Sequence, residues 1–333
     1  MMFAILASVS VLKQALSEPL LIPKALLVTK IVGWREGQTT VGRYFWWSPT
    51  KILAYLEEDK RAILDTQTKK LTPIQVHKDV YEDEVSPDRT KVILHLQKDD
   101  VMSRRVSDPL GAKDFGSWTT KIKEPHQYRS GDYGHSGPEA IWSQDGRRIF
   151  EIDYWYEGGK FWAKTSQRSI DGLSAVRTYP LATIARGSAI SVYDGKALLS
   201  PYQFGIGKHF WLKEWNLETP GKDVQKWLVN APSDQFILQY RHSPDFKHAF
   251  WIMDRASSKP MTDNGYPHTD VSLWVSGLHG ENLAEVGVIP FGTKNQGDLM
   301  DHYQHFGEIQ WNPDNKNVSF VYYRNLYMVQ VVK

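Results

Sequence analysis

A short phrase recurs six times along this chain of 333 residues. Each copy has a large residue, a small polar residue, Pro, Asp and a polar turn, and an alternating apolar run follows. The clearest copies span 142–150 and 311–320, and weaker ones begin at Trp47, Val85, Ser191 and His242. Pro suits the second position of a type I turn, and Asp or Gly suits the positions after it. Each copy therefore predicts two strands joined by a tight turn.

The spacing of the copies predicts the fold. Successive copies are 38, 57, 49, 51 and 69 residues apart. A four-stranded propeller blade takes about 40–50 residues, so the longer steps predict insertions at 98–117 and 255–270. Both segments are rich in Asp, Ser, Pro and Gly, as surface loops are. We therefore expect an all-β fold, a six-bladed β-propeller of four-stranded antiparallel blades.

The two ends of the chain are expected to share one blade. The last unit has three recognisable strands, at 306–311, 317–323 and 326–332, while the apolar run at 25–32 precedes the first unit and has no blade of its own. We expect this N-terminal strand to add to the last blade as its outer strand and close the ring. Residues 18–333 are then one domain, which we expect to be a monomer.

The first 17 residues are typical of a secretion signal. Met2 to Leu12 form an apolar run of 11 residues, which is too short for a bilayer that requires about 20. Ala15 and Ser17 then place small residues where a signal peptidase cleaves. We expect a periplasmic or secreted protein whose mature chain has no integral membrane segment. The alternative is a buried N-terminal segment.

Composition excludes several functions. The net charge is +2 without a basic tract, so no electrostatic footprint for nucleic acid is present. The absence of cysteine excludes disulfides, thiol catalysis and thiolate metal sites. The chain has no Gly-x-Ser-x-Gly elbow and no P-loop. Its 13 tryptophans are expected mainly in the core between blades.

Candidate binding residues lie where the innermost strands should run. The positions three residues before each large residue are Tyr44, Glu82, Glu139, Ser188, Gln239 and Glu308, and Arg241 is close by. Related positions in successive blades should lie at similar heights near the central channel. Carboxylates gathered there bind a hard cation or a basic group of a partner. The alternative is that each Glu pairs with a neighbouring Lys or Arg, or faces water.

Histidines suggest a second set of ligands. His302 and His305 precede Glu308, and His135 holds a similar place before Glu139. Imidazole together with carboxylate suits manganese, iron or zinc, so His135, His302, His305 and Glu308 are candidate ligands for one divalent metal ion. The alternative is that these histidines cap loop turns.

The repeats "WSQDGRRIFEI", "WNPDNKNVSFV" and "HSPDFKHAFWI" resemble the WD40-like propeller repeat of the TolB family. The same repeat occurs in the non-catalytic propeller of prolyl oligopeptidase and dipeptidyl peptidase relatives. The resemblance extends from about residue 25 to the C-terminus. The fourth copy departs from it, because Ser191 replaces the usual Trp and the Pro is missing.

Two functions follow as expectations. The first is a non-enzymatic exported binding or scaffold module that uses one face and the channel mouth for a protein, a carbohydrate or another small ligand. The alternative is a metal-assisted lyase or hydrolase acting on an extracellular carbohydrate, with His135, His302, His305 and Glu308 as ligands or bases. Propeller lyases of similar repeat type use a His/Gln metal site, which Gln304 and His305 match only in part.

Overall fold

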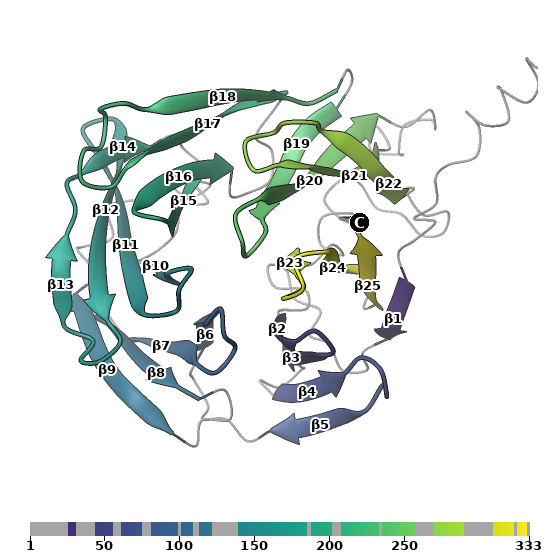
Figure 1. Ribbon diagram of the computed structural model, residues 1–333, viewed down its shortest axis with the longest axis horizontal. Coiled ribbons are helices and arrows are strands. Elements are labelled where there is room, and N and C mark those ends of the chain that lie inside the picture. Colours follow the sequence, from purple (N-terminus) through teal and green to yellow (C-terminus); the bar gives the residue numbers. More distant parts are fainter. Residues whose placement is uncertain are drawn as a thin grey trace, which may run out of the picture.

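The structure is a computed structural model. It describes residues 26–30, 44–55, 61–74, 81–98, 101–108, 113–121, 139–184, 188–201, 208–232, 235–256, 269–289, 309–322 and 325–331. The described strands form six antiparallel sheets arranged in a ring (Figure 1). This confirms the predicted all-β, six-bladed propeller.

The first three blades follow one another along the chain. Blade 1 contains β2 (Tyr44–Ser48), β3 (Lys51–Tyr55), β4 (Arg61–Asp65) and β5 (Leu71–Ile74). Blade 2 contains β6 (Tyr81–Val85), β7 (Val92–Lys98), β8 (Val101–Ser107) and β9 (Asp114–Lys121). Blade 3 contains β10 (Glu139–Trp142), β11 (Arg148–Glu157), β12 (Lys160–Ser169) and β13 (Ala175–Thr178), and a fifth strand, β14 (Ala182–Ile184), also pairs with β12.

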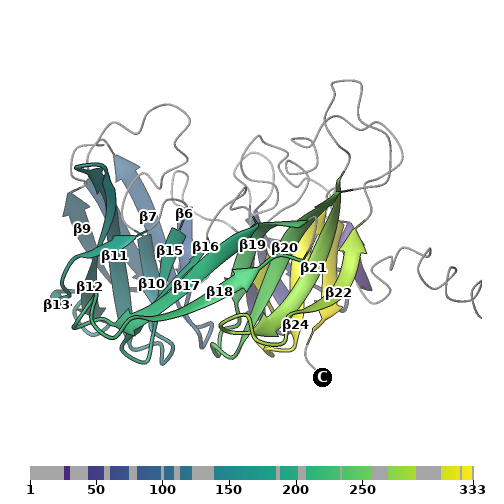
Figure 2. The ribbon, with the colours of Figure 1, turned by 90° about the horizontal axis from the view of Figure 1, so that it is seen from above.

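The remaining blades complete the ring. Blade 4 contains β15 (Ser188–Tyr193), β16 (Lys196–Pro201), β17 (His209–Asn216) and β18 (Gln225–Asn230). Blade 5 contains β19 (Gln235–His242), β20 (His248–Ala256), β21 (Thr269–Gly277) and β22 (Ala284–Ile289). Blade 6 contains β23 (Gln310–Trp311), β24 (Asn317–Tyr322), β25 (Asn325–Gln330) and, at its outer edge, β1 (Leu26–Lys30). In the side view the strands run between the two faces of the ring (Figure 2).

The N-terminal strand pairs where the sequence placed it. β1 is antiparallel to β25, with Leu26 opposite Met328 and Lys30 opposite Asn325. The pairing joins the two ends of the described chain in one sheet. That this pairing holds the ring closed is a statement about stability, and it stays a prediction.

The core lies between the blades. One cluster joins Phe250 of blade 5 to Trp311 and Phe320 of blade 6, and Trp46 and Trp251 are fully buried. Burying such a side chain contributes about 2–3 kcal/mol. The expectation that aromatic residues mainly form the core is confirmed for these residues, although Tyr156 and Trp211 are exposed.

The predicted insertion at 98–117 is wrong. Residues 101–107 and 114–121 are β8 and β9, the two outer strands of blade 2. The sequence predicts a loop here because the segment is rich in Asp, Ser, Pro and Gly. A polar residue can nevertheless lie in a strand, as Arg104 does, because it is 1% exposed and paired across the blade interface. The second predicted insertion, 255–270, falls largely between β20 and β21, and residues 257–268 lie outside the described part. Nowhere among the described residues does a helix long and apolar enough to cross a membrane occur.

Candidate functional site

The repeat turns share one hydrogen-bonded geometry. The hydroxyl groups of Ser86, Ser143 and Ser243 donate to the aspartate two residues later at 2.6, 2.5 and 2.6 Å. The residue after each aspartate, and the matching residue of blade 6, has a left-handed backbone, with φ of +62, +67, +55 and +58°. Because each turn joins the innermost strand to the next, all four lie on the same face of the ring. We call these four turns, at 86–90, 143–147, 243–247 and 312–316, the rim.

Two of the predicted channel positions are core residues instead. Tyr44 is fully buried, and its hydroxyl lies 2.8 Å from Ser319 Oγ of blade 6. Ser188 is 5% exposed, and its hydroxyl has no hydrogen-bond partner within the described part of the chain. The Tyr44 side chain therefore belongs to the interface between blades 1 and 6, and the Ser188 side chain is buried.

The other predicted positions lie on innermost strands where they are described. Glu139 begins β10, is half-buried and accepts a hydrogen bond from Tyr154 at 3.4 Å. Gln239 and Arg241 are half-buried in β19. Glu82 lies in β6 opposite Leu94, but its side chain is outside the described part, as is Glu308. The shared ring of carboxylates stays a prediction.

Side chains from the adjacent blade satisfy the inner edges of the sheets. In the described sheets, each innermost strand is an edge strand. The backbone N–H and C=O groups on its free edge have no neighbouring strand to pair with. The Trp142 backbone N–H donates to Glu84 Oε2 at 2.5 Å, and the Trp311 indole donates to the Arg241 carbonyl at 3.0 Å. The large residue of the repeat therefore joins blades as well as filling the core.

Ser191, the degenerate position of the fourth copy, is compensated by the next blade. His242 Nε2 lies 2.9 Å from Ser191 Oγ, and Nδ1 lies 3.0 Å from the Ser243 carbonyl. Because a carbonyl only accepts, Nδ1 carries the proton and Nε2 accepts from the Ser191 hydroxyl. Burial lowers the pKa of His242 to about 4, with a contribution from the Arg241 charge, although the Ser243 hydrogen bond opposes the shift.

Phe246 occupies a strained turn position beside His242. Its φ is +55°, which is uncommon for a bulky residue. Its ring stacks on His242 at 4.0 Å and on Tyr193 at 4.3 Å between centroids. This three-ring stack offsets the backbone strain and joins blades 4 and 5 at the rim.

The predicted metal ligands His135, His302, His305 and Glu308 lie outside the described residues. Within the described ranges, no group of three or more His, Asp and Glu side chains is placed to hold a metal ion. The metal site stays a prediction.

A pocket of about 300 Å³ opens at the rim between blades 3 and 4. It is lined by Gln144, Asp145 and Arg148 of blade 3 and by Asp194 and Gly195 of blade 4. Consecutive left-handed residues, with φ of +46° and +73°, make the Asp194–Gly195 pair a type I′ turn. Among these side chains, two are acidic and one is basic, so the lining favours a cation.

The two carboxylates of the pocket differ in their partners. Arg148 Nη2 lies 3.3 Å from Asp145 Oδ2. Hydrogen bonds from Ser143 and the Arg147 backbone also lower the pKa of Asp145. Asp194 is exposed and has no ion pair with any described residue. The Asp194 carboxylate is therefore available to a ligand.

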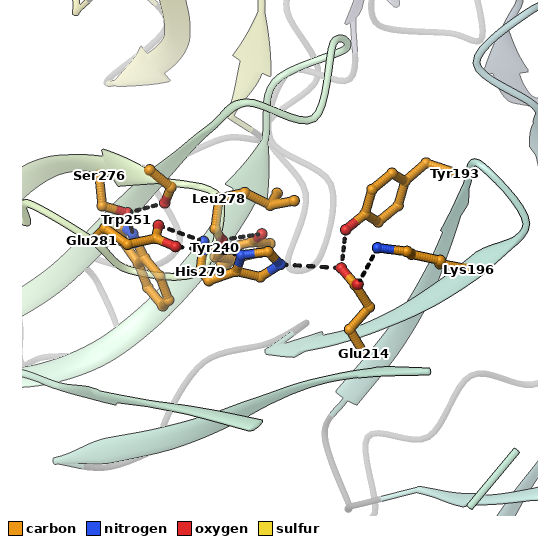
Figure 3. A network of polar contacts seen from close by, with 10 residues as sticks. Tyr193, Lys196, Glu214, Tyr240, Trp251, Ser276, Leu278, His279 and Glu281 are labelled. Atoms are coloured by element: carbon orange, nitrogen blue, oxygen red, sulfur yellow. Dashed lines mark hydrogen bonds and ion pairs between the residues drawn. The ribbon is translucent and has the colours of Figure 1, made fainter. Parts of the chain in front are cut away.

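A polar network joins blades 4 and 5 behind the rim (Figure 3). Glu214 is 3% exposed. It accepts hydrogen bonds from Tyr193, from Lys196 at 2.7 Å and from His279 at 3.1 Å. The His279 ring stacks on Trp227 with 3.7 Å between centroids. Tyr193 thus contributes to the pocket lining, the three-ring stack and this network.

The network keeps Glu214 ionised. Burial alone would raise the pKa of Glu214, but hydrogen bonds from Lys196, Tyr193 and His279 outweigh it, and the pKa is lower than usual. Burial and the nearby Glu214 carboxylate raise the pKa of Tyr193. Lys196 is half-exposed, with 48% of its side chain accessible. The network therefore reaches solvent through Lys196.

A second buried carboxylate joins blades 2 and 3. Glu151 is 4% exposed and bonds Arg104 Nη1 at 2.9 Å and Arg168 Nη2 at 2.7 Å. Thr120 Oγ1 donates to the same carboxylate, and Arg168 lies over the Trp118 ring. Neither this network nor that of Glu214 was predicted, because the partners lie on other strands with no fixed sequence spacing.

Together, the fold and the rim define the class as a six-bladed β-propeller with a polar pocket between the turns of two neighbouring blades. No family profile matches this chain, and no curated protein matches it in sequence. Solved structures match at the level of the fold. A protein assigned as TolB from Agrobacterium tumefaciens is 14% identical with a TM-score of 0.41, over 88% of this chain and 90% of that one.

Two other similar structures are enzymes by description. A gluconolactonase from Xanthomonas campestris is 11% identical with a TM-score of 0.44, over 92% of this chain and 88% of that one. Pyrococcus horikoshii acylaminoacyl peptidase is 11% identical with a TM-score of 0.40, over 88% of this chain and 43% of that one. These similarities are distant, so they assign no specific function.

Proposed function

We propose that this protein is a non-enzymatic binding module. The pocket between blades 3 and 4, with the adjoining channel mouth, holds a small ligand or a protein segment that carries a cationic group. The observation that supports this most is the exposed Asp194 carboxylate at a polar pocket of about 300 Å³. We also propose that the protein is exported after cleavage of residues 1–17, which the mass of the mature N-terminus tests.

Preorganisation supports the binding role. Ser143 and Asp145 fix the turn on one side of the pocket by a hydrogen bond of 2.5 Å, and the Asp194–Gly195 turn fixes the other side. A site held rigid before binding loses little conformational entropy when a ligand enters. Such a rim is better suited to recognition than a flexible loop is.

The test is a calorimetric titration with agmatine, a small molecule with a guanidinium group and an amine. We expect the wild-type protein to bind agmatine. Asp194→Asn should weaken binding about fivefold or more, because one charge interaction of about 1 kcal/mol is lost. Asn also tolerates the left-handed backbone, so the turn is kept.

Asp223→Asn is the matched control. Asp223 is also exposed, with φ of +48°, but it does not line the pocket, and its replacement should leave agmatine binding unchanged. Equal weakening by both variants, or no binding by the wild-type protein, would contradict the proposal.

A further inference from the structure

Among the described outermost strands of four or more residues, which leaves out the three-residue β14, the strand of blade 4 differs from the others. β5 contains Pro73. β1, β9, β13 and β22 each have an irregularity in their pairing register. β18 has neither Pro nor Gly, and all six of its residues pair regularly with β17. Proline, bulges and charged side chains, lysine above all, stop a sheet edge from pairing with another chain. The edge at β18 lacks proline and a bulge but carries Lys226, so only a strand of opposite charge suits it.

One face of the β17–β18 hairpin is largely open to solvent beyond Trp215, which is on the same face and packs against blade 3. Alternate residues of a strand share a face, and the register places His209 opposite Asn230, Trp211 opposite Leu228, and Lys213 opposite Lys226. We call these six residues the cation–aromatic face. The other face packs against blade 5 through Phe210, Leu212 and Val229.

Large apolar side chains are exposed on the cation–aromatic face. Trp211 is 46% exposed and Leu228 is 44% exposed. Residues directly opposite each other have Cβ atoms about 5 Å apart, so the two side chains adjoin. An exposed apolar pair beside an open strand edge is typical of an interaction surface.

The charges of this face are unbalanced. Lys213 and Lys226 are direct cross-strand neighbours, and like charges in this arrangement destabilise a sheet. The face has no acidic residue, and neither lysine forms an ion pair with a described residue. An incoming anion would remove the repulsion that the fold itself leaves in place.

We propose that β18 binds an extended acidic segment of a partner protein as an additional strand. In such a strand, side chains two residues apart share a face, which matches the spacing of Lys226 and Leu228. The partner therefore carries an acidic residue two positions from an apolar one, opposite Lys226 and Leu228 respectively. The main chain supplies affinity and the alternate side chains supply specificity. This surface lies outside the pocket at the rim and adds a second binding function.

The probe is the fluorescein-labelled peptide Thr-Glu-Thr-Leu-Thr-Glu-Thr, which presents Glu and Leu on one face in either strand direction. Fluorescence polarisation should show binding to the full chain. Lys226→Glu should reduce affinity at least about tenfold, because attraction becomes repulsion. The same substitution faces Lys213 with an opposite charge, so the melting temperature should rise. If Lys226 had only a structural role, the substitution would lower both the affinity for the peptide and the melting temperature.

Two controls distinguish binding as an additional strand from simple charge attraction. Lys222→Glu changes an exposed lysine in the β17–β18 turn and should leave affinity unchanged. A peptide with alternate N-methylated amides keeps its charges but cannot donate to a strand edge, and it should not bind. The proposal would be overturned if the methylated peptide bound as well as the parent peptide, or if the parent peptide did not bind. It would also be overturned if polygalacturonate displaced the bound parent peptide.

Discussion

Glu151 and Glu214 are both buried carboxylates that join neighbouring blades, but their partners differ. Glu151 is held by two arginines, of which Arg104 is 1% exposed. Glu214 is held by Lys196, which is half-exposed, by His279 and by the Tyr193 hydroxyl. Arginine binds a carboxylate through a planar, rigid fork of donors, whereas lysine is a point charge on a flexible stem.

The difference in partners indicates that the two buried carboxylates have different roles at their blade interfaces. At the Glu151 interface the carboxylate and Arg104 are 4% and 1% exposed, so the interface is fixed. At the Glu214 interface Lys196 is 48% exposed and can turn toward solvent. The interface that adjusts lies beside the proposed ligand pocket, since Tyr193 contributes to both.

The largest effect is expected at the fixed interface. Glu151→Gln would leave the guanidinium groups of Arg104 and Arg168 without a counter-charge in a buried site. Breaking such a pair costs about 3–5 kcal/mol, measurable as the free energy of unfolding in urea. Glu218→Gln is the control, because its pair with Arg177 is about half-exposed on both sides, and its cost should be at most about 0.5 kcal/mol.

A smaller effect is expected at the adjustable interface. Glu214→Gln should cost about 1–2 kcal/mol, because Lys196 is half-exposed and can turn to water. The same urea titration measures it. If this variant lost as much stability as Glu151→Gln, the distinction between the two interfaces would be wrong.

A further effect at the interface between blades 4 and 5 emerges only in acid. His242 lies between blades 4 and 5, and its pKa is lowered to about 4 from an ordinary 6.5. A histidine held neutral stabilises the fold fully above pH 6.5, and this contribution is lost as the pH falls toward 4. The free energy of unfolding should fall by at most about 3 kcal/mol over this window.

His242→Gln is the variant that assigns the pH effect. It should flatten the dependence between pH 6.5 and pH 4. The Glu214 contribution is also lost in acid, but only below its unfolded value of 4.5, because its folded pKa is lower still. An unchanged slope in His242→Gln would show that other groups cause the loss.

The parts of this fold that the sequence predicts are those with local causes. The Ser143–Asp145 hydrogen bond and the left-handed Gly146 lie within one turn, so the repeat phrase records them directly. The strand β1 was recognisable as an apolar run without a blade. Local chemistry thus explains why the blade number and the turns could be predicted.

The parts that were missed depend on contacts between blades. Arg104 looked like a loop residue because its partner Glu151 is 47 positions away. Ser191 looked like a lost repeat because its partner His242 is 51 positions away. The pocket was also missed, since its two walls come from turns of different blades. No periodicity in the sequence records such pairs.

The central claim is that this propeller recognises a ligand rather than performing metal-assisted chemistry. The most direct test is the metal content of the purified, untagged chain by elemental mass spectrometry. We predict no stoichiometric manganese, iron, zinc or calcium. About one equivalent of any of these per chain, lost on replacing His302 and His305 by Ala, would contradict the account and favour the metal-assisted enzyme.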